Sequence, residues 1–311
     1  MEIVVTSPMD LSTEQKKRLE NCGEVTYHNS EPETVEEWLE RCHGFKLVCA
    51  GKSGMTWPLS KKDTSRLGIY HLRQGTLVSH PFVNVAMISK EELRAAGVRL
   101  SYAPGSNRQA VSEWAMAMLL ELFRNFSQAV NLDNDKVKLV RTKSLSGKSI
   151  AILGMGAVGQ EVARLAEAFG MLVRPFHRRD NLYDTVHNVD VVVNCLSSLE
   201  ENKGMLDQHY FAAMSKGSFF VTMTNPAIWD IDALLDALDS GHLAGAAIDI
   251  GNKGPGDVTA STYQKVAGHS RVLATPQIAH FSDLSASISF DMMIENIEAA
   301  SREETPPYLW A

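Results

Sequence analysis

IAILGMGAVG, at residues 150–159, is the stretch that decides the fold of this chain. Its four leading apolar residues predict a buried strand, and the G-x-G-x-x-G pattern is typical of a turn that leads from such a strand into a helix and binds a dinucleotide. The glycines permit a tight turn, let a pyrophosphate approach the backbone and let the helix pack closely on the strand. The residues expected to hold the cofactor at this turn are Gly154, Met155, Gly156, Ala157, Val158 and Gly159.

The residues after the turn continue the same unit. Apolar side chains recur at three- and four-residue spacing from Val162 to Phe169, which predicts a helix that ends at Gly170. Leu172–Phe176 then has the composition of a second strand. The alternative is a glycine turn in an unrelated α/β domain. The order of strand, turn, helix and strand favours the dinucleotide-binding interpretation.

Composition indicates a globular protein of two domains. The chain has 311 residues, 44% hydrophobic and 22% charged, which is enough to bury two cores. Its net charge of -7 is spread along the sequence without a block of Lys and Arg. This distribution argues against nucleic acid as the main partner.

Other features predict a cytoplasmic protein. Strand-like residues start at Ile3, and no run reaches the ~18 apolar residues of a membrane helix, so we expect neither a signal peptide nor a membrane partner. The cysteines show no C-x-x-C pair and no histidine at metal-ligand spacing, which indicates a reduced compartment and predicts no metal site. They are Cys22, Cys42, Cys49 and Cys195.

Alternating strand and helix signals predict two α/β domains. In the first, strands are expected at 3–5, 25–27 and 45–50, with helices at 12–21 and 32–42. A long helix at 109–125 follows as a connector. Strands at 189–196, 218–223, 245–250 and 271–275 join the two around the glycine turn, which gives six parallel strands. The last helix, at 284–300, is expected to return to the first domain.

Several motifs together resemble the D-2-hydroxyacid dehydrogenase family. They are SGK at 146–148, NCL at 194–196, LAGAAID at 243–249, ATP at 274–276, and APGSN at 103–107 followed by VSEWA at 111–115. The resemblance implies two Rossmann-like domains with doubly wound parallel sheets and a cleft between them. It assigns residues 1–102 plus 284–311 to a flavodoxin-like substrate domain and 103–283 to the dinucleotide-binding domain. It also implies a small-molecule substrate, a 2-oxo or 2-hydroxy acid, and a homodimer.

The resemblance extends to further cofactor contacts and to three catalytic positions. Cys195, Leu196 and Thr224 match strand-end cofactor residues, and Asp249 matches the residue that contacts the nicotinamide carboxamide. At the catalytic positions the chain departs from the family. Asn225 stands where the family has its substrate-binding Arg, Gly254 where it has a Glu, and Gln277 where it has the acid/base His. A glutamine amide cannot exchange a proton near neutral pH, so the family's usual mechanism is not expected.

Other groups are candidates for the missing functions. His280 follows Gln277 closely and could donate a proton, although a histidine with a purely structural role is an open alternative. Lys52 could bind a substrate carboxylate in place of the lost Arg, although an exposed lysine with no such role is the open alternative. The candidate catalytic residues are therefore His280, Gln277, Asn225 and Lys52. An imine that arrives already protonated would demand less of a site that has lost its acid.

The end of the second strand of the dinucleotide unit bears on the choice between NAD and NADP. An NAD site usually has Asp or Glu there, about 20 residues after the glycines, to bind the ribose 2′-hydroxyl. This chain has His177 followed by Arg178 and Arg179, which favours the 2′-phosphate of NADP. The alternative is that the arginines are solvated loop charges beside an NAD site.

Two functions of different classes follow from these residues. The first is an NADP(H)-dependent oxidoreductase, with NAD also possible, that reduces a small carbonyl or imine substrate at a non-standard catalytic site. The second is a catalytically silent dinucleotide-binding protein that acts as a sensor or scaffold. The altered residues 225, 254 and 277 support the second, and the intact cofactor motif is compatible with both.

Overall fold

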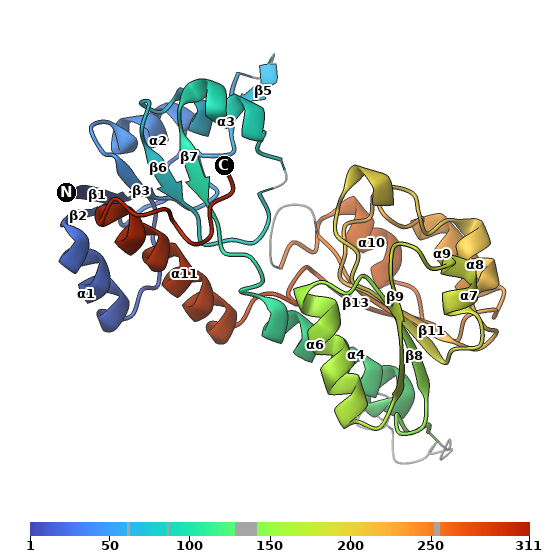
Figure 1. The fold of residues 1–311 in the computed structure, drawn as a ribbon. Coiled ribbons are helices and arrows are strands. Elements are labelled where there is room, and N and C mark those ends of the chain that lie inside the picture. The colour runs from blue at the N-terminus through green and yellow to red at the C-terminus, as the bar shows by residue number, and fades with distance from the viewer. Residues whose placement is uncertain (61–62, 86, 128–141, 252–255) are drawn as a thin grey trace. The chain divides into compact units, whose positions relative to one another are not determined.

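The chain folds into two compact units. The computed structural model describes residues 1–60, 63–85, 87–127, 142–251 and 256–311 (Figure 1). Unit 1 comprises Met1–Asn107 and Asp283–Ala311, and unit 2 comprises Arg108–Ser282. Unit 1 thus runs to residue 107, against 102 expected from the sequence.

Unit 1 is built on a five-stranded sheet in which every strand pair is parallel. Numbered within the unit, the strand order is 2-1-3-4-5, the order of flavodoxin-like folds. In spatial order the strands are β2 Glu24–Tyr27, β1 Glu2–Val5, β3 Leu47–Cys49, β6 Leu77–Ser79 and β7 Arg99–Ser101. A separate antiparallel hairpin joins β4 Pro58–Ser60 to β5 Asp63–Leu67.

Helices cover both faces of this sheet because successive strand side chains point to opposite sides. On one face Ile3 and Val5 pack with residues of α1, Thr13–Cys22, and α11, Asp283–Ser301. On the other face Val4 packs with residues of the remaining helices. These are α2 Val35–Cys42, η1 Gly68–His71 and α3 Lys90–Ala96.

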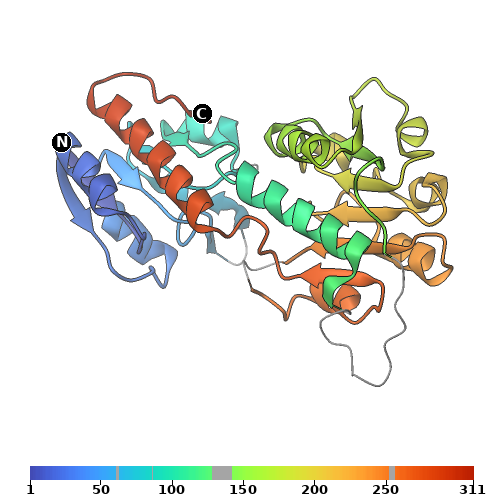
Figure 2. The same cartoon turned by 90° about the horizontal axis from the view of Figure 1, so that it is seen from below.

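Hydrogen bonds from α11 and from the chain beyond it tie the C-terminal segment to the rest of unit 1. The Arg18 guanidinium of α1 donates from Nε and Nη2 to Glu298 of α11, both at 2.9 Å, and the helices lie side by side in Figures 1 and 2. Beyond α11 the chain pairs with β7, where the Leu100 amide donates to the Ala311 carbonyl at 2.9 Å. The expected return of the last helix to the first domain is therefore what the structure shows.

Unit 2 contains all six predicted strands, and they form one parallel sheet. The spatial order is β13 Val272–Thr275, β12 Gly245–Asp249, β11 Phe219–Thr222, β10 Val191–Asn194, β8 Ser149–Leu153 and β9 Leu172–Phe176. The strand β9 lies at the edge of this sheet, and it contains Pro175. An edge strand can accommodate a proline because one side of the strand needs no backbone donor. The predicted α/β class with two parallel sheets is confirmed.

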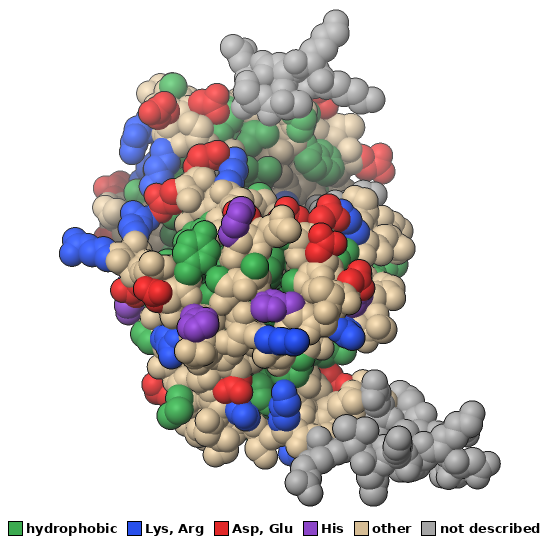
Figure 3. Space-filling view, turned by 90° about the vertical axis from the view of Figure 1, so that its right-hand side faces the viewer, with side chains coloured by type: hydrophobic (Ala, Val, Ile, Leu, Met, Phe, Trp, Pro, Cys, Tyr) green, Lys and Arg blue, Asp and Glu red, His purple; other side chains and the backbone are tan. Residues whose placement is uncertain are grey.

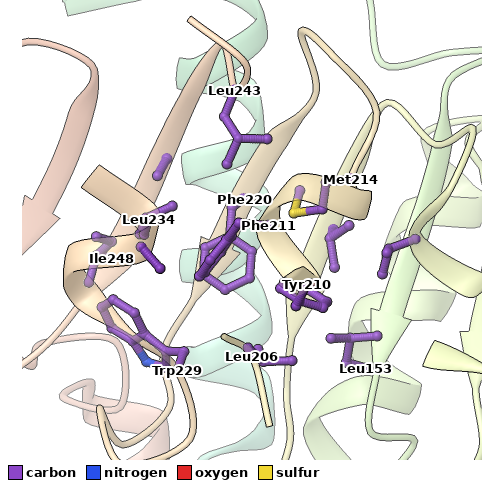
Figure 4. Packing of buried hydrophobic residues seen from close by; sticks show 14 of the residues in the cluster. Leu153, Leu206, Tyr210, Phe211, Met214, Phe220, Trp229, Leu234, Leu243 and Ile248 are labelled. Atoms are coloured by element: carbon purple, nitrogen blue, oxygen red, sulfur yellow. The ribbon is translucent and has the colours of Figure 1, made fainter. Parts of the chain in front are cut away.

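Two helical layers enclose the unit 2 sheet. Residues of α4 Arg108–Arg124 and α6 Ala157–Ala168 form one core with alternate strand residues. The other face is covered by α7 Leu182–Val186, α8 Gln208–Ala213, α9 Ile231–Asp239 and α10 Ser261–Ala267. Figure 4 shows this second core, in which Phe220 and Phe211 lie edge to face with ring centroids 5.2 Å apart. Both sheet faces are therefore buried, and only the strand ends are open to ligands.

The surface carries both signs of charge. On the face in Figure 3, Lys and Arg side chains are interspersed with Asp, Glu and His. Among the described residues, no helix combines the length and apolar character needed to cross a membrane.

Candidate functional site

The glycine turn joins β8 to α6, and the close packing of the surrounding backbone requires glycine at two of its positions. Gly154 has φ +91°, and a Cβ there would lie 2.8 Å from the Cys195 carbonyl oxygen. At Gly159 a Cβ would lie 2.0 Å from the Gly154 carbonyl oxygen, so α6 could not pack this closely on its strand with any other residue. These two positions set the shape of the turn.

The remaining glycine, Gly156, faces open space. A Cβ built on it meets no atom within 4 Å, and the residue is exposed. It is also the N-cap of α6 and supplies no side-chain hydrogen bond to the first turn, whose amides have no partner within the helix. Ala157 is exposed as well, whereas Met155 and Val158 pack partly against the core. Exposed amides and the positive end of the helix dipole make this turn a good fit for a pyrophosphate.

The end of β10 lies directly beside the turn. The Cys195 amide donates to the Leu153 carbonyl at 2.8 Å, which extends the pairing of β8 with β10. Burial raises the pKa of the Cys195 thiol to about 12, so the thiol stays protonated at neutral pH and is no nucleophile. Leu196 packs partly against the core. Cys195 and Leu196 thus form a wall of the turn.

Asn194 organises the neighbouring strand ends, and sequence reasoning missed it as a site residue. It is fully buried, and its Nδ2 donates to the hydroxyls of Thr222 at 3.3 Å and Thr224 at 2.8 Å. Its Oδ1 accepts from the Leu196 amide at 3.2 Å. The available signal was a polar residue closing the apolar run VVVN. Through Asn194, the ends of β10 and β11 are held as one piece.

At the end of β9 the structure adds an acid to the predicted cations. His177, Arg178 and Arg179 are all exposed. The Arg178 guanidinium pairs with Glu201, so its charge is partly committed. The Asp180 carboxylate accepts from the His177 amide at 2.7 Å, and the Asp180 amide donates back to the His177 carbonyl at 2.9 Å. A carboxylate, that of Asp180, therefore lies at this strand end beside the predicted cofactor residues.

Asn225 follows β11 and shapes its own loop. It is exposed, and its Oδ1 accepts from the Ala227 amide at 2.8 Å. Trp229 donates from Nε1 to the Thr224 carbonyl at 3.4 Å and is otherwise buried in the core of Figure 4. The side-chain oxygen of Asn225 is therefore engaged in a turn, and its side-chain nitrogen, Nδ2, is the group that can reach a ligand.

Asp249, at the end of β12, holds the loop that follows β13. Its Oδ1 accepts from the Thr275 hydroxyl at 2.5 Å and the Ile278 amide at 2.8 Å. Its Oδ2 accepts from the Ala279 amide at 2.9 Å. Trp114 of α4 in turn donates to the Thr275 hydroxyl at 3.1 Å. One buried carboxylate thus fixes residues 275–279 against the sheet.

Gln277 lies at the centre of this loop in an unusual conformation. Its φ of +56° is in the left-handed region, which non-glycine residues rarely adopt. Its Oε1 is buried and has no hydrogen-bond partner among the described residues. His280 lies three residues further on and is half-buried, and the Ser282 amide donates to its carbonyl at 3.2 Å. The loop therefore presents an amide and an imidazole near the end of β13.

Lys52 belongs to unit 1, unlike every other predicted site residue. It follows β3, and its Nζ lies 5.0 Å from the centroid of the Phe82 ring. Desolvation lowers the pKa of the Lys52 ammonium. His80, in the adjacent loop after β6, is buried and uses Nδ1 in a 2.8 Å hydrogen bond with the Ala50 carbonyl. A cation, an aromatic ring and an imidazole thus meet at the strand ends of unit 1.

The remaining sequence predictions concern Gly254, metal binding and the cysteines. Gly254 lies outside the described residues. Among the residues that are described, no group of three or more His, Cys, Asp or Glu side chains could hold a metal ion. All four cysteines are described and all are free thiols.

A parallel sheet whose first strand leads through three glycines into a helix defines a dinucleotide-binding protein. Comparison with known proteins gives the family. Residues 116–279 match the model of the D-isomer specific 2-hydroxyacid dehydrogenase, NAD binding domain. The chain therefore belongs to the D-2-hydroxyacid dehydrogenase family, a class of NAD(P)-dependent oxidoreductases.

Individual relatives agree with this family. D-3-phosphoglycerate dehydrogenase of Bacillus subtilis is 30% identical over 219 residues, which cover 65% of this chain and 41% of that protein. D-lactate dehydrogenase of Treponema pallidum is 25% identical over 233 residues, covering 67% of this chain and 70% of the relative. A solved acyclic imino acid reductase in complex with NADPH and D-Arg has the same fold, with TM-score 0.81, 19% identity and full coverage of both chains.

Proposed function

We propose that this protein is an NADP(H)-dependent oxidoreductase that reduces a small carbonyl or imine compound. The glycine turn carries the proposal, because Gly156 leaves open space at the uncapped N-terminus of α6 while Gly154 and Gly159 hold the turn in shape. Membership of a dehydrogenase family supports the reaction class.

The cofactor's parts match successive strand ends. The first-turn amides of α6 would hold the pyrophosphate, and Cys195, Leu196 and Thr224 would line its path across the ends of β10 and β11. Among the described residues, Asp249 Oδ2 accepts a hydrogen bond only from the Ala279 amide. This oxygen could therefore also accept from the nicotinamide carboxamide N–H. When bound, the reduced nicotinamide supplies a hydride, and this chain's residues orient the substrate beside it.

The preference for NADP rests on the end of β9. Arg179 has no ion pair among the described residues, whereas Arg178 already pairs with Glu201. Asp180 turns its carboxylate onto the His177 amide, which partly satisfies the acid and leaves the exposed arginines as the groups that meet a 2′-phosphate.

The substrate site replaces the usual acid and carboxylate clamp. We assign the proton donor to His280, which shares the loop held by Asp249. We also propose that Lys52 binds a carboxylate at the strand ends of unit 1. The Asn225 amide nitrogen is a weaker, uncharged donor at the position of the family's Arg. The acyclic imino acid reductase of this fold, solved in complex with NADPH and D-Arg, supports the proposed cofactor and an imine substrate.

Calorimetric titration with NADPH and NADH tests the cofactor assignment. We expect NADPH to bind about tenfold more tightly, a difference of ~1.4 kcal/mol, and Arg179→Gln to remove that preference. The matched control is Arg164→Gln, an exposed arginine on α6. NADH binding equal to or tighter than NADPH binding would refute the preference.

A turnover assay tests the catalytic assignment. With 2-oxo acids, aldehydes and imines as substrates, we expect NADPH oxidation that falls at least tenfold in His280→Ala while the NADPH affinity is kept. His209→Ala, an exposed histidine on α8, serves as control. Full activity of His280→Ala would remove His280 from the mechanism.

The second candidate is a dinucleotide sensor or scaffold without catalysis. The amides of Asn225 and Gln277 favour it, since neither can transfer a proton. Tight NADPH binding with no turnover of any substrate in the assay above would select this function. For either function we propose a cytoplasmic homodimer, which a light-scattering mass of twice the 34.3 kDa chain would support.

A further inference from the structure

We infer that Gln277 selects a carbon–nitrogen double bond over a carbonyl group, which makes this site one for 2-imino acids. The inference rests on the proposed reductase function and narrows its substrate class. In this assignment the Gln277 Oε1 accepts a hydrogen bond from a substrate N–H, and Gln277 is a specificity-determining residue that touches the substrate.

The first support is that the loop maintains a costly conformation. A non-glycine residue at φ +56° costs on the order of 1 kcal/mol, and such strain persists where surrounding contacts enforce it. Here the enforcing contacts are those from Thr275, Ile278 and Ala279 to the Asp249 carboxylate. The Gln277 amide donates to the Thr275 carbonyl at 3.0 Å, which closes the turn. The side chain of Gln277 thus projects from a fixed backbone.

The second support is the unsatisfied oxygen. A buried acceptor without a partner costs about 1–3 kcal/mol, so such an atom is expected to find its donor in a ligand. The other groups of the loop do not supply that donor: the amides of Ile278 and Ala279 both bind Asp249. The loop therefore needs a hydrogen-bond donor that comes from outside the described protein residues.

The chemistry of the two substrate classes then differs at this oxygen. A 2-oxo acid offers only carbonyl and carboxylate oxygens, and an acceptor opposite the Gln277 Oε1 is repelled. An iminium nitrogen carries N–H groups and matches it. Turning the amide over would offer Nε2 to a carbonyl, yet a carboxamide releases no proton near neutral pH, so the carbonyl oxygen would lack its acid at this position.

The reaction balances without an acid at residue 277. A 2-oxo acid and ammonia condense with loss of water, and the imine takes up a proton from His280, the proposed donor, to give an iminium ion. The hydride adds to the iminium carbon, the π electron pair becomes the lone pair of nitrogen, and the nicotinamide is oxidised. The resulting amine takes its proton from water after release. Reduction of a ketone requires a proton on its oxygen during hydride transfer. The Gln277 carboxamide cannot donate that proton.

The test compares NADPH oxidation with pyruvate or glyoxylate in the presence and absence of ammonium chloride, with the amino acid product identified by mass spectrometry. We expect the full-length protein to show at least tenfold higher kcat/KM with ammonium than without it. Gln277→Met keeps the side-chain length but removes the acceptor, so the ammonium-dependent rate should fall about tenfold. Its NADPH affinity and thermal midpoint should stay unchanged.

Two further variants separate specificity from structure. Gln277→Glu keeps an acceptor and should retain imine reduction, whereas Gln277→His supplies an acid and should raise reduction of the 2-oxo acid without ammonium. Equal rates with and without ammonium in the unmodified protein, or the same ratio in Gln277→Met, would overturn the role of Gln277 and leave the reductase function standing. No turnover with either substrate despite NADPH binding would defeat both.

Discussion

The glycine turn at 154–159 and the loop at 275–280 follow strands of the same sheet, but different forces shape them. Backbone packing fixes the turn, since a Cβ at Gly159 would meet the Gly154 carbonyl at 2.0 Å. A single carboxylate, Asp249, fixes the loop through three hydrogen bonds. The turn therefore admits little change while it binds a dinucleotide, whereas none of the loop's bonds to Asp249 comes from residue 277. Cofactor binding and chemistry are separable in this fold.

The largest effect is expected from breaking the turn. Gly159→Val places a branched side chain against the backbone of Gly154, so α6 must move away from β8. We expect loss of measurable NADPH binding and a fall of more than ~3 kcal/mol in the free energy of unfolding. Calorimetric titration and urea unfolding measure the two quantities.

Gly268→Ala is the matched control for that variant. Gly268 has φ -86°, and a Cβ there meets no atom within 4 Å. Its substitution should leave both quantities nearly unchanged. If Gly159→Val bound NADPH as well as the Gly268→Ala control, close packing at the turn would not be what forms the cofactor site.

A smaller effect is expected from releasing the loop. Asp249→Ala removes the acceptor of the Ile278 and Ala279 amides, and we expect about 2–3 kcal/mol lower stability. Hydrogen exchange at these two amides should rise, because each loses its only described partner. Urea unfolding and amide exchange by mass spectrometry test this, with Asp239→Ala, an exposed carboxylate on α9, as the control. Unchanged exchange at residues 278 and 279 would show that other contacts hold the loop.

Sequence patterns revealed the fold where the signal is local. The run IAIL, the glycines and the six strands of unit 2 were all predicted, since each strand is an apolar stretch between turn signals. The strands β6 and β7 were missed because three residues each, such as LVS, carry almost no periodicity. The pairing of the C-terminal tail with β7 was missed because it joins residues 100 and 311, which no local pattern relates.

The same limit applies to the candidate site. The positions of Gly154 and Gln277 followed from motifs, but the loop-holding role of Asp249 depends on hydrogen bonds to residues 26 to 30 positions away. Asp180 was overlooked because its carboxylate reaches the strand end only through a turn. Sequence thus located the strand ends, and the folded chain showed which side chains they engage.

The smallest effect extends the comparison to unit 1, where a neutral histidine holds a strand end in place of a carboxylate. Burial lowers the pKa of His80 to about 4, and its Nδ1 bonds the Ala50 carbonyl at 2.8 Å. In the unfolded chain His80 binds a proton near pH 6.5, whereas in the folded chain it does so only near pH 4. The contribution of neutral His80 to the free energy of unfolding is therefore complete above pH 6.5. It is lost as the pH falls from 6.5 towards 4.

Between pH 7.5 and pH 5 the His80 contribution should fall by about 2 kcal/mol. His80→Asn keeps a donor for the Ala50 carbonyl but cannot titrate, so its unfolding free energy should depend less on pH by that amount. Urea unfolding at the two pH values measures the difference, with His209→Asn on the exposed surface of α8 as control. If the unfolding free energy of His80→Asn fell as much between pH 7.5 and pH 5 as that of the unmodified protein, His80 would be protonated in the folded state. The strand end of unit 1 would then be held by a charged group, as the Asp249 loop is in unit 2.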